Sequence, residues 1–235
     1  MNSCARGVDG HAPGSTGEAA GRSRPERFFI RFGESEEARM LVEKYHYSGR
    51  FSANVQVCAT FHRSGGLFGT CGEAVAACVV SIPPTRWSEP VMELSRLVRA
   101  EGVDVPLSQL VGLTMRECRR RGIGLVVSFA DWTQRHHGGV YQSCSWNFGG
   151  TREPRMDGLV IGGVFVPGRS ANSAYGTRSV GELAKRGIDA EAHWDEGKHL
   201  YWNALTRAGV ESAKRLGLQS LAYPKPGRNA ELNEG

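Results

Sequence analysis

The chain has 235 residues, of which 40% are apolar, and this length suits one globular domain with a core and a cleft rather than two full domains. Lys and Arg number 29 against 24 Asp and Glu, a net charge of +5 that mildly favours a polyanionic partner, although solvated surface would produce it too. The chain lacks an apolar run of about 18 residues and any CxxC spacing among its 6 cysteines, which argues against a membrane span or a zinc site and for an intracellular protein.

The first part of the chain predicts an edge strand, a helix and a strand meander. Residues 1–25 are rich in Gly, Ala, Ser and Arg without hydrophobic periodicity, so we expect them to be disordered before a strand over residues 27–32. A helix capped by Ser35 follows, with four residues at helical spacing: Ala38, Leu41, Val42 and Tyr45. Three strands separated by turns rich in Gly or Pro come next: residues 55–61, 74–82 and 91–98.

The second part predicts a crossover helix and a buried strand. Pro106 opens a helix that Gly122 ends, with one apolar face: Leu107, Leu110, Val111, Thr114, Met115 and Cys118. Residues 123–129 are an apolar run typical of a strand buried on both faces, so strand, helix and strand imply a right-handed crossover and a parallel pair. Three further elements are expected: a strand over residues 159–166, a short helix after the capping box Ser179 and Glu182, and a helix over residues 205–216.

This order of elements predicts an α/β (α+β) fold. It would have a mixed sheet with an antiparallel meander and one parallel crossover, flanked by helices, over a single domain from residue 26 to residue 235. The same layout of one helix, a meander, a crossover helix and a further strand is found in the GNAT acyltransferases. We therefore expect a GNAT-like fold that ends in a basic aromatic tail.

The buried strand leads into Asp131, the best candidate for acid or base chemistry. A carboxylate after such a strand lies at the carboxyl edge of the sheet, where ligands of open α/β sheets usually bind. An Asp that merely caps the following turn would look the same. His136 and His137 are also candidates for metal binding, but neighbours in sequence seldom point the same way and exposed loop histidines are commoner.

Two segments interleave aromatic and basic residues. Residues 44–50 lie at the end of the first helix, where their aromatic rings could bracket a nucleobase or simply anchor the helix end. Residues 198–202 and the tail beyond them suit contacts to a nucleic-acid backbone, although docked aromatics with solvated lysines would read the same. The predicted DNA-binding residues are His46, Tyr47, Lys198, His199, Tyr201, Trp202, Lys225 and Arg228.

Six short motifs carry a family resemblance. In chain order they are Glu93 to Leu97, the region of Ser108, Val127 to Asp131, Gly139 to Gln142, Tyr175 to Ser179 and Lys198 to Trp202. Their order and spacing over residues 27–226 resemble the Mom family of DNA-modification proteins of phage Mu and its relatives.

The resemblance implies a GNAT-like transferase that converts adenine in double-stranded DNA to its N6-methylcarbamoyl form. This change shields phage DNA from restriction enzymes, which places the protein in the host cytoplasm. The positions that the family is thought to need are matched by four residues: Arg96, Ser108, Asp131 and Tyr141. The resemblance also leaves room for a bound iron, with His46, Tyr47 and Asp131 as ligand types, but no spacing in the sequence requires one.

The implied chemistry assigns roles to these residues. The adenine amine is a poor nucleophile, so a base that accepts its proton should accelerate the reaction by roughly 10²–10⁴-fold. We assign this role to Asp131, with Tyr141 protonating the leaving group and Ser128 as a third catalytic residue. Typical GNAT enzymes cradle pyrophosphate with a Gly-rich loop, and residues 103–108 here lack glycine. We expect Arg96 and Ser108 to hold an anionic, acyl-CoA-type donor by side-chain contacts instead.

The adenine reaction needs the base out of the stack and in an aromatic pocket, for which four residues are available: Tyr47, Trp132, Trp146 and Trp202.

Two other functions stay open. A small-molecule N-acyltransferase of the same fold would carry a glycine-bearing phosphate loop and would not depend on a basic tail. A non-catalytic nucleic-acid-binding protein would leave Asp131 unexplained, since a carboxylate opposes phosphate binding.

Overall fold

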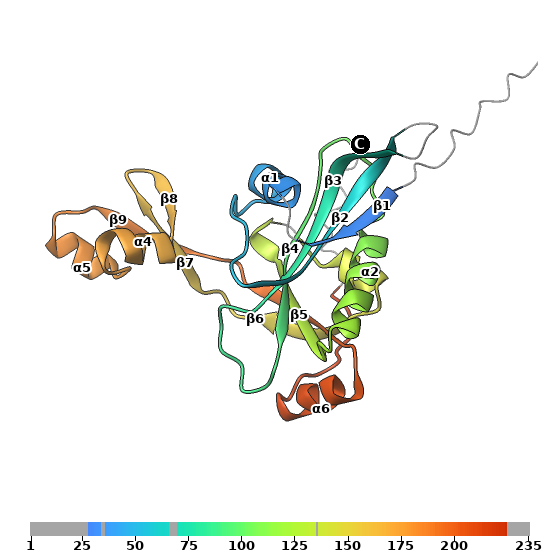
Figure 1. Ribbon diagram of the computed structural model, residues 1–235. Helices are drawn as coiled ribbons and strands as arrows, with labels where there is room; N and C mark the ends of the chain where they lie inside the picture. The colour runs from blue at the N-terminus through green and yellow to red at the C-terminus, as the bar shows by residue number, and fades with distance from the viewer. Residues whose placement is uncertain (1–27, 34–35, 66–69, 135, 225–235) are drawn as a thin grey trace, which may run out of the picture.

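A seven-stranded mixed sheet forms the body of the molecule. The computed structural model describes residues 28–33, 36–65, 70–134 and 136–224, and Figure 1 shows their arrangement. Within these residues the strand order is β1-β2-β3-β4-β5-β10-β6. The strands are β1 (Phe28–Phe32), β2 (Val55–Gly65), β3 (Thr70–Ser81), β4 (Met92–Arg99), β5 (Leu125–Asp131), β6 (Asn147–Arg152) and β10 (Lys198–Ala204). β4 and β5 run parallel, and the other neighbours are antiparallel.

Helices cover both faces of this sheet, which explains the apolar runs in its central strands. In β3, Ala76 and Cys78 share a buried cluster with the residues of α2 (Leu107–Arg120), whereas Ala77 and Val79 pack with α1 (Glu36–Tyr45). Successive side chains of a strand point to opposite faces, so a strand buried on both sides is apolar throughout. The helix α6 (Arg207–Arg215) packs against the neighbouring strands β5 and β10. The mixed sheet, meander and crossover predicted from the sequence are therefore confirmed.

The two parallel strands β4 and β5 separate soon after they meet. They pair at Met92 with Val126 and at Glu93 with Val127. The register of β4 on β3 shifts between Val79 and Val80, which leaves a bulge at Ser95. A bulge bends its strand, and here it lies where β4 turns away from β5. The divergence opens a space between two strands that would otherwise be joined by hydrogen bonds.

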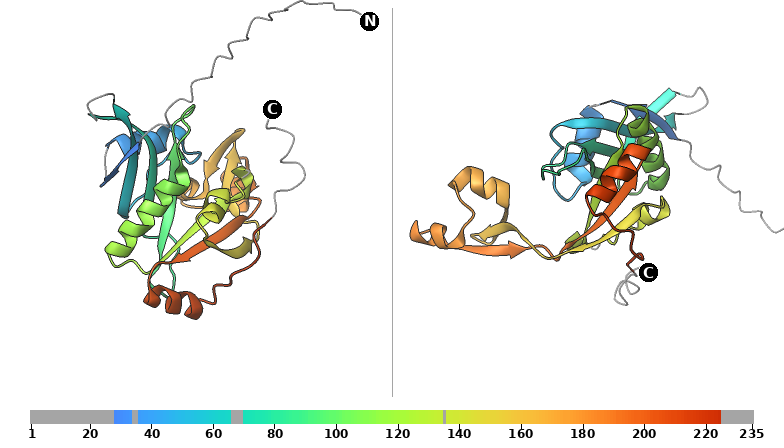
Figure 2. Two further views of the ribbon diagram at one scale, coloured as in Figure 1. Left: turned by 90° about the vertical axis from the view of Figure 1, so that its right-hand side faces the viewer. Right: turned by 90° about the horizontal axis from the view of Figure 1, so that it is seen from below.

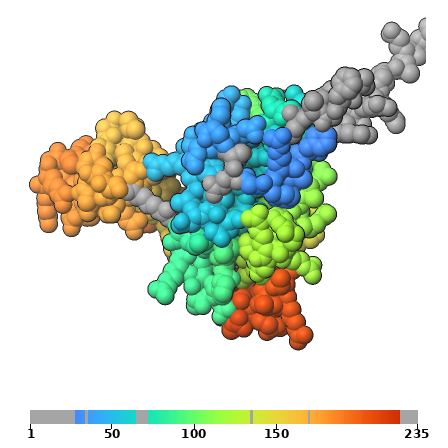
Figure 3. All heavy atoms as spheres, viewed as in Figure 1, coloured from blue at the N-terminus to red at the C-terminus, as the bar shows by residue number. Residues whose placement is uncertain are grey.

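A small lobe is inserted between β6 and β10. It has a three-stranded sheet of order β8-β7-β9 and two helices: β7 (Met156–Ile161), β8 (Val164–Pro167), β9 (Ala190–Trp194), α4 (Gly168–Tyr175) and α5 (Val180–Lys185). Four buried residues form its own core: Leu159, Ala171, Leu183 and Ala190. The lobe projects from the body in Figure 1, in the right view of Figure 2 and in Figure 3. The Arg50 guanidinium donates to the Ser170 hydroxyl at 2.8 Å, which links the body to α4.

Several elements differ from the sequence prediction. The single strand expected over residues 159–166 is wrong, because Gly162 and Gly163 take φ of +57° and +76° and turn the chain into the hairpin of β7 and β8. Residues 198–202, expected in a basic aromatic segment, belong to β10 inside the main sheet. Ser179 caps the short helix as predicted, since its Oγ accepts from the amide of Glu182, but the Ser179 amide donates to Thr177 Oγ1 and not to the Glu182 side chain, so the full capping box is not formed. Residues 1–25 lie outside the described part of the chain.

Among the residues that the structure describes, no helix is both long enough and apolar enough to cross a membrane.

Candidate active site

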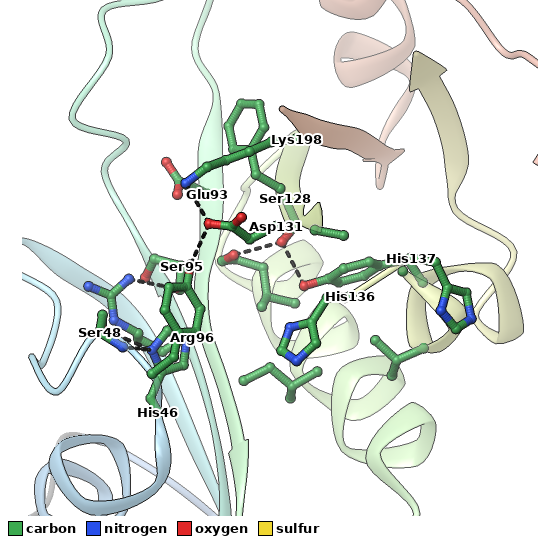
Figure 4. Close-up of a pocket in the computed structure, with 18 of the residues that line it drawn as sticks. His46, Ser48, Glu93, Ser95, Arg96, Ser128, Asp131, His136, His137 and Lys198 are labelled. Carbon is green, nitrogen blue, oxygen red and sulfur yellow. Dashed lines mark hydrogen bonds and ion pairs between the residues drawn. The ribbon is translucent and has the colours of Figure 1, made fainter. Parts of the chain in front are cut away.

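A cleft of about 700 Å³ lies where β4 and β5 separate. Its walls come from β4, β5, β10, the end of α1 and the short helix α3 (Gly139–Ser143). Six of the lining residues carry the argument below: His46, Tyr47, Arg96, Asp131, Tyr141 and Lys198. Figure 4 shows Arg96 and His46 on one wall and Asp131, Ser128 and Lys198 on the other.

The cleft passes through the sheet, because residues on both faces of β5 line it. Ser128 and Asp131 both line the cleft, and their spacing in a strand places them on opposite faces. Asp131 lies directly across from Lys198 of β10, on the face that Phe129 and Leu200 share. Ser128 lies on the other face, next to Tyr141. A molecule entering from each face would therefore meet different side chains.

The Asp131 carboxylate is buried, with both oxygens in contact with neighbours. Its Oδ2 lies 2.8 Å from the Lys198 ammonium and accepts a longer contact of 3.5 Å from the Tyr47 hydroxyl. Its Oδ1 accepts from the amide of Thr133 at 3.1 Å. Burial alone would raise the pKa of Asp131, but the hydrogen bond and charge of Lys198 outweigh it and hold the pKa below its ordinary value. Asp131 is thus ionised at neutral pH, and it also caps the turn after β5.

Tyr141 and Ser128 form a buried pair of hydroxyl groups. Ser128 Oγ lies 2.8 Å from both the Leu94 carbonyl and the Tyr141 hydroxyl. A carbonyl can only accept, so while Ser128 donates to Leu94 its oxygen is open to the proton of Tyr141. Burial raises the pKa of Tyr141 despite its contact with Ser128, which keeps the phenol protonated. Tyr141 is placed by Gly138, whose φ of +82° starts α3 and whose missing side chain leaves room for the ring of Tyr201.

His46 and Tyr47 present aromatic rings at the rim of the cleft. Their rings stack with centroids 4.5 Å apart, and the His136 ring lies edge-on to Tyr47 with the centroids 6.3 Å apart. Tyr47 is 53% exposed, so one face of its ring is available to a ligand. Burial, followed by the charges of Arg96 and His136, lowers the pKa of His46 to about 4. His46 is therefore neutral at physiological pH, with Nδ1 bonded to Ser48 Oγ at 2.8 Å.

The two residues predicted to hold a donor lie in different environments. Arg96 lines the cleft beside the bulge of β4, and its guanidinium donates to the carbonyls of Arg50 at 2.9 Å and Ser95 at 2.6 Å. Ser108 is in the first turn of α2, and its carbonyl accepts from Cys144 Sγ. The nearby Leu107, rather than Ser108, is among the residues that line the cleft. The structure thus brings Arg96, but not the Ser108 side chain, to the cleft wall.

Lys198 is the main residue whose place the sequence did not reveal. It was predicted to contact DNA phosphates, but the structure places it in the cleft wall against Asp131. Burial alone would lower the pKa of Lys198, but Asp131, Tyr47 and Asp195 raise it above its ordinary value. The pairing depends on the register of β5 against β10, two strands more than 60 residues apart in the chain. A Lys in a segment not predicted to be a strand gives no signal for such a pair.

The other predicted DNA-binding residues are dispersed. His199 is 7% exposed and Tyr201 is fully buried, with its hydroxyl bonded to the carbonyl of His137, so neither offers a ring face for stacking in this arrangement. Trp202 is half-buried and donates to the carbonyl of Gln219, and Trp146 is buried in the core. Lys225 and Arg228 lie outside the described residues. Tyr47 remains the aromatic residue best placed for a ligand.

The side chains suggested as iron ligands do not fit a bound metal in this arrangement. The Asp131 oxygen that faces Tyr47 is already paired with the Lys198 ammonium, so a cation would have to displace a cation. The described residues contain no group of three His, Cys, Asp or Glu side chains that could hold a metal ion. We therefore derive no step through iron.

Comparisons with known proteins give a family match and several similar solved structures. A family model described as the Mom protein family matches residues 27–225, and no curated protein matches. Similar solved structures include the ribosomal-protein-S18-alanine N-acetyltransferase of Escherichia coli, at 10% identity and a TM-score of 0.45, covering 77% of this chain and 95% of that one. Another is yncA, a putative acetyltransferase of Salmonella typhimurium with its cofactor acetyl-CoA, at 10% identity and a TM-score of 0.48, with the same coverages. These likenesses concern the fold alone.

Proposed function

This chain belongs to the Mom protein family, and on that premise we propose that it is a transferase that adds a methylcarbamoyl group to adenine N6 in double-stranded DNA. The observation that carries the proposal is the cleft through the sheet, with an ionised carboxylate on one face and a protonated phenol on the other. A transfer between two molecules needs a proton acceptor on the side of the nucleophile and a proton donor on the side of the leaving group.

The acceptor side of the cleft suits an exocyclic amine on an aromatic base. Tyr47 offers an exposed ring on which a flipped adenine can stack, and the Asp131 carboxylate lies 3.5 Å from its hydroxyl. In the proposed step the amine nitrogen forms a bond to the transferred carbon as the bond from that carbon to the leaving group breaks. Asp131 takes the amine proton. Because Lys198 lowers the pKa of Asp131, the carboxylate acts mainly by accepting a hydrogen bond until the amine becomes acidic in the transition state.

The donor side suits an anionic, acyl-CoA-type molecule. Tyr141 is protonated and lines the cleft, so it can give its proton to the departing group, and the resulting phenolate accepts a hydrogen bond from Ser128 until solvent in the cleft returns a proton. Arg96 supplies a guanidinium on the cleft wall, and Leu107, the first residue of α2, lines the same cleft, which brings the positive end of the helix dipole near it. These groups would take the place of the missing Gly-rich loop. We place the reaction in the host cytoplasm, where modification would protect phage DNA from restriction.

The test is mass spectrometry of deoxynucleosides from DNA of cells that express the chain. The proposal predicts a modified deoxyadenosine with the mass of the methylcarbamoyl adduct, absent from cells with an empty vector. If DNA stays unmodified while a purified small amine is acylated by the protein and acyl-CoA, the chain is a small-molecule N-acyltransferase instead. If neither substrate reacts and the protein still binds DNA, the proposed enzyme activity is wrong.

A further inference from the structure

The strand that returns from the lobe contacts one oxygen of Asp131 directly, and the segment before that strand supports the other oxygen through Thr133. Lys198, the first residue of β10, contacts Oδ2 through its ammonium. The other oxygen accepts from the amide of Thr133, and the Thr133 hydroxyl accepts from the amide of Glu196 at 3.0 Å. The orientation of the carboxylate therefore depends on the short segment between the lobe and β10.

Asp195 fastens this segment at the base of the lobe. Its carboxylate is 1% exposed and accepts from the amides of Arg155 at 2.9 Å and Gly197 at 3.1 Å. It also accepts from the Arg152 guanidinium at 3.1 Å and lies 3.9 Å from the Lys198 ammonium. One buried carboxylate thus ties the chain entering the lobe to the chain leaving it. An unpaired buried charge would be costly, so these contacts act as a unit.

We propose that Lys198 and Asp195 are positioning residues that hold the Asp131 carboxylate toward the cleft and tie its orientation to the lobe. The inference rests on the proposed function for the role of Asp131. The charged and titratable groups around Lys198 are Asp131, Asp195 and Tyr47, with Arg152 and Glu93 also in the cleft wall. Lys198 lies between two carboxylates, 2.8 Å from Asp131 Oδ2 and 3.9 Å from Asp195 Oδ2, so a move of its ammonium to a DNA phosphate would leave both of them without this partner.

The activity test compares Lys198→Met and Lys198→Arg with wild type on duplex DNA. A carboxylate that loses its partner reorients, and misplacement of about 1 Å can cost roughly 10²-fold in rate, so Lys198→Met should lower kcat by about that factor. The Kd for DNA and its salt dependence should stay unchanged, and Lys198→Arg should recover part of the kcat. Asp195→Asn should lower kcat in the same direction. Lys214→Met, which removes an exposed lysine paired with Glu211 on α6, is the matched control and should have no effect.

Two outcomes would overturn the inference. An unchanged kcat for Lys198→Met would show that Asp131 does not need its partner. A salt slope reduced by about 0.9, with kcat unchanged, would make Lys198 a phosphate contact.

A second measurement does not depend on DNA and separates this inference from the proposed function. Urea unfolding of wild type, Lys198→Met, Asp131→Asn and the double variant forms a double-mutant cycle. The inference predicts that the double variant loses less in unfolding midpoint than the two single variants combined, and that Lys198→Met with Lys214→Met is additive. Additive losses for Lys198 and Asp131 would overturn the inference. If the cycle shows this coupling but wild-type protein modifies no DNA, the proposed function is wrong, and the inference that Lys198 holds Asp131 still stands.

Discussion

The main sheet and the lobe are stabilised in different ways. The sheet is covered by helices on both faces, and its core extends from β2 to β10. The three strands of the lobe have α4 and α5 against one face, around a core of four buried residues, while Phe165 and Val164 stay exposed. A double-sided core provides more buried area per residue than a single-sided one. We conclude that the sheet supplies rigidity for the cleft, whereas the lobe is the part of the molecule that can open locally.

The cleft lies where these two regions meet. Tyr141 and Arg96 depend on the sheet, but Lys198 follows directly from the lobe. A site built on both regions can respond to what the lobe contacts, because the segment from Asp195 to Lys198 transmits any shift of the lobe to Asp131. The predictions below test this division, starting with the largest expected effect.

Core truncation should separate the two regions most clearly. Leu110 of α2 and Leu183 of α5 are both fully buried, one in each core. Leu110→Ala should lower the free energy of global unfolding by about 2–5 kcal/mol, through lost burial and the cavity left behind. Leu183→Ala removes the same atoms, but the loss should appear mainly as faster hydrogen exchange in β7 to β9. An equal loss of hydrogen-exchange protection in β3 for both variants would show that sheet and lobe unfold as one unit.

The base of the lobe should be sensitive to a single added methyl group. Gly197 has φ of +93°, and a Cβ there would lie 2.5 Å from the backbone oxygen of Arg152. Gly197→Ala should therefore cost about 1–3 kcal/mol in unfolding free energy and lower activity, since it displaces Lys198. Gly176→Ala is the control, because Gly176 has φ of +68° but open space around its Cβ position. Equal losses for the two variants would mean that backbone strain alone, and not the contact with Arg152, sets the cost.

Acid should lower the stability of the fold through His46, by less than the two substitutions above. The pKa of His46 is about 4 in the fold, below its value of about 6.5 in an unfolded chain. Below pH 6.5 the unfolded chain therefore binds a proton that the folded protein refuses, so the stability that is present above pH 6.5 declines as the pH falls toward 4. His46→Gln should reduce the difference in urea midpoint between pH 7 and pH 5. An unchanged difference would show that His46 takes up its proton normally in the fold.

Most of the main sheet could be predicted from the sequence. Residues 125–127 are apolar throughout because β5 is buried on both faces, and the face of Leu110, Val111 and Met115 has helical spacing because α2 covers a single side of the sheet. The position of Asp131 in the cleft could be predicted because Asp131 ends the buried strand. These patterns are local, so the chain itself displays them.

Other features depend on contacts between distant segments. β10 was missed as a sheet strand because Lys198, His199 and Tyr201 are polar or aromatic residues that serve the site and the core, and their pattern also suits a surface segment. The pairing of Lys198 with Asp131 requires the register of two strands, which composition does not encode. The hairpin of the lobe was detectable, since Gly162 and Gly163 between apolar residues are a turn signal.

The most direct test of the account is the Asp131→Asn variant. Asn has nearly the same shape and can still accept the bond from the amide of Thr133, but it cannot take a proton. We predict a protein that still folds, with a lower urea midpoint because Lys198 loses its partner, and a Kd for DNA close to that of wild type, with modified deoxyadenosine per unit of protein reduced by roughly 10²-fold or more. Near wild-type levels of modified deoxyadenosine in DNA from cells that express Asp131→Asn would contradict the account, because Asp131 would then serve only to cap the turn after β5.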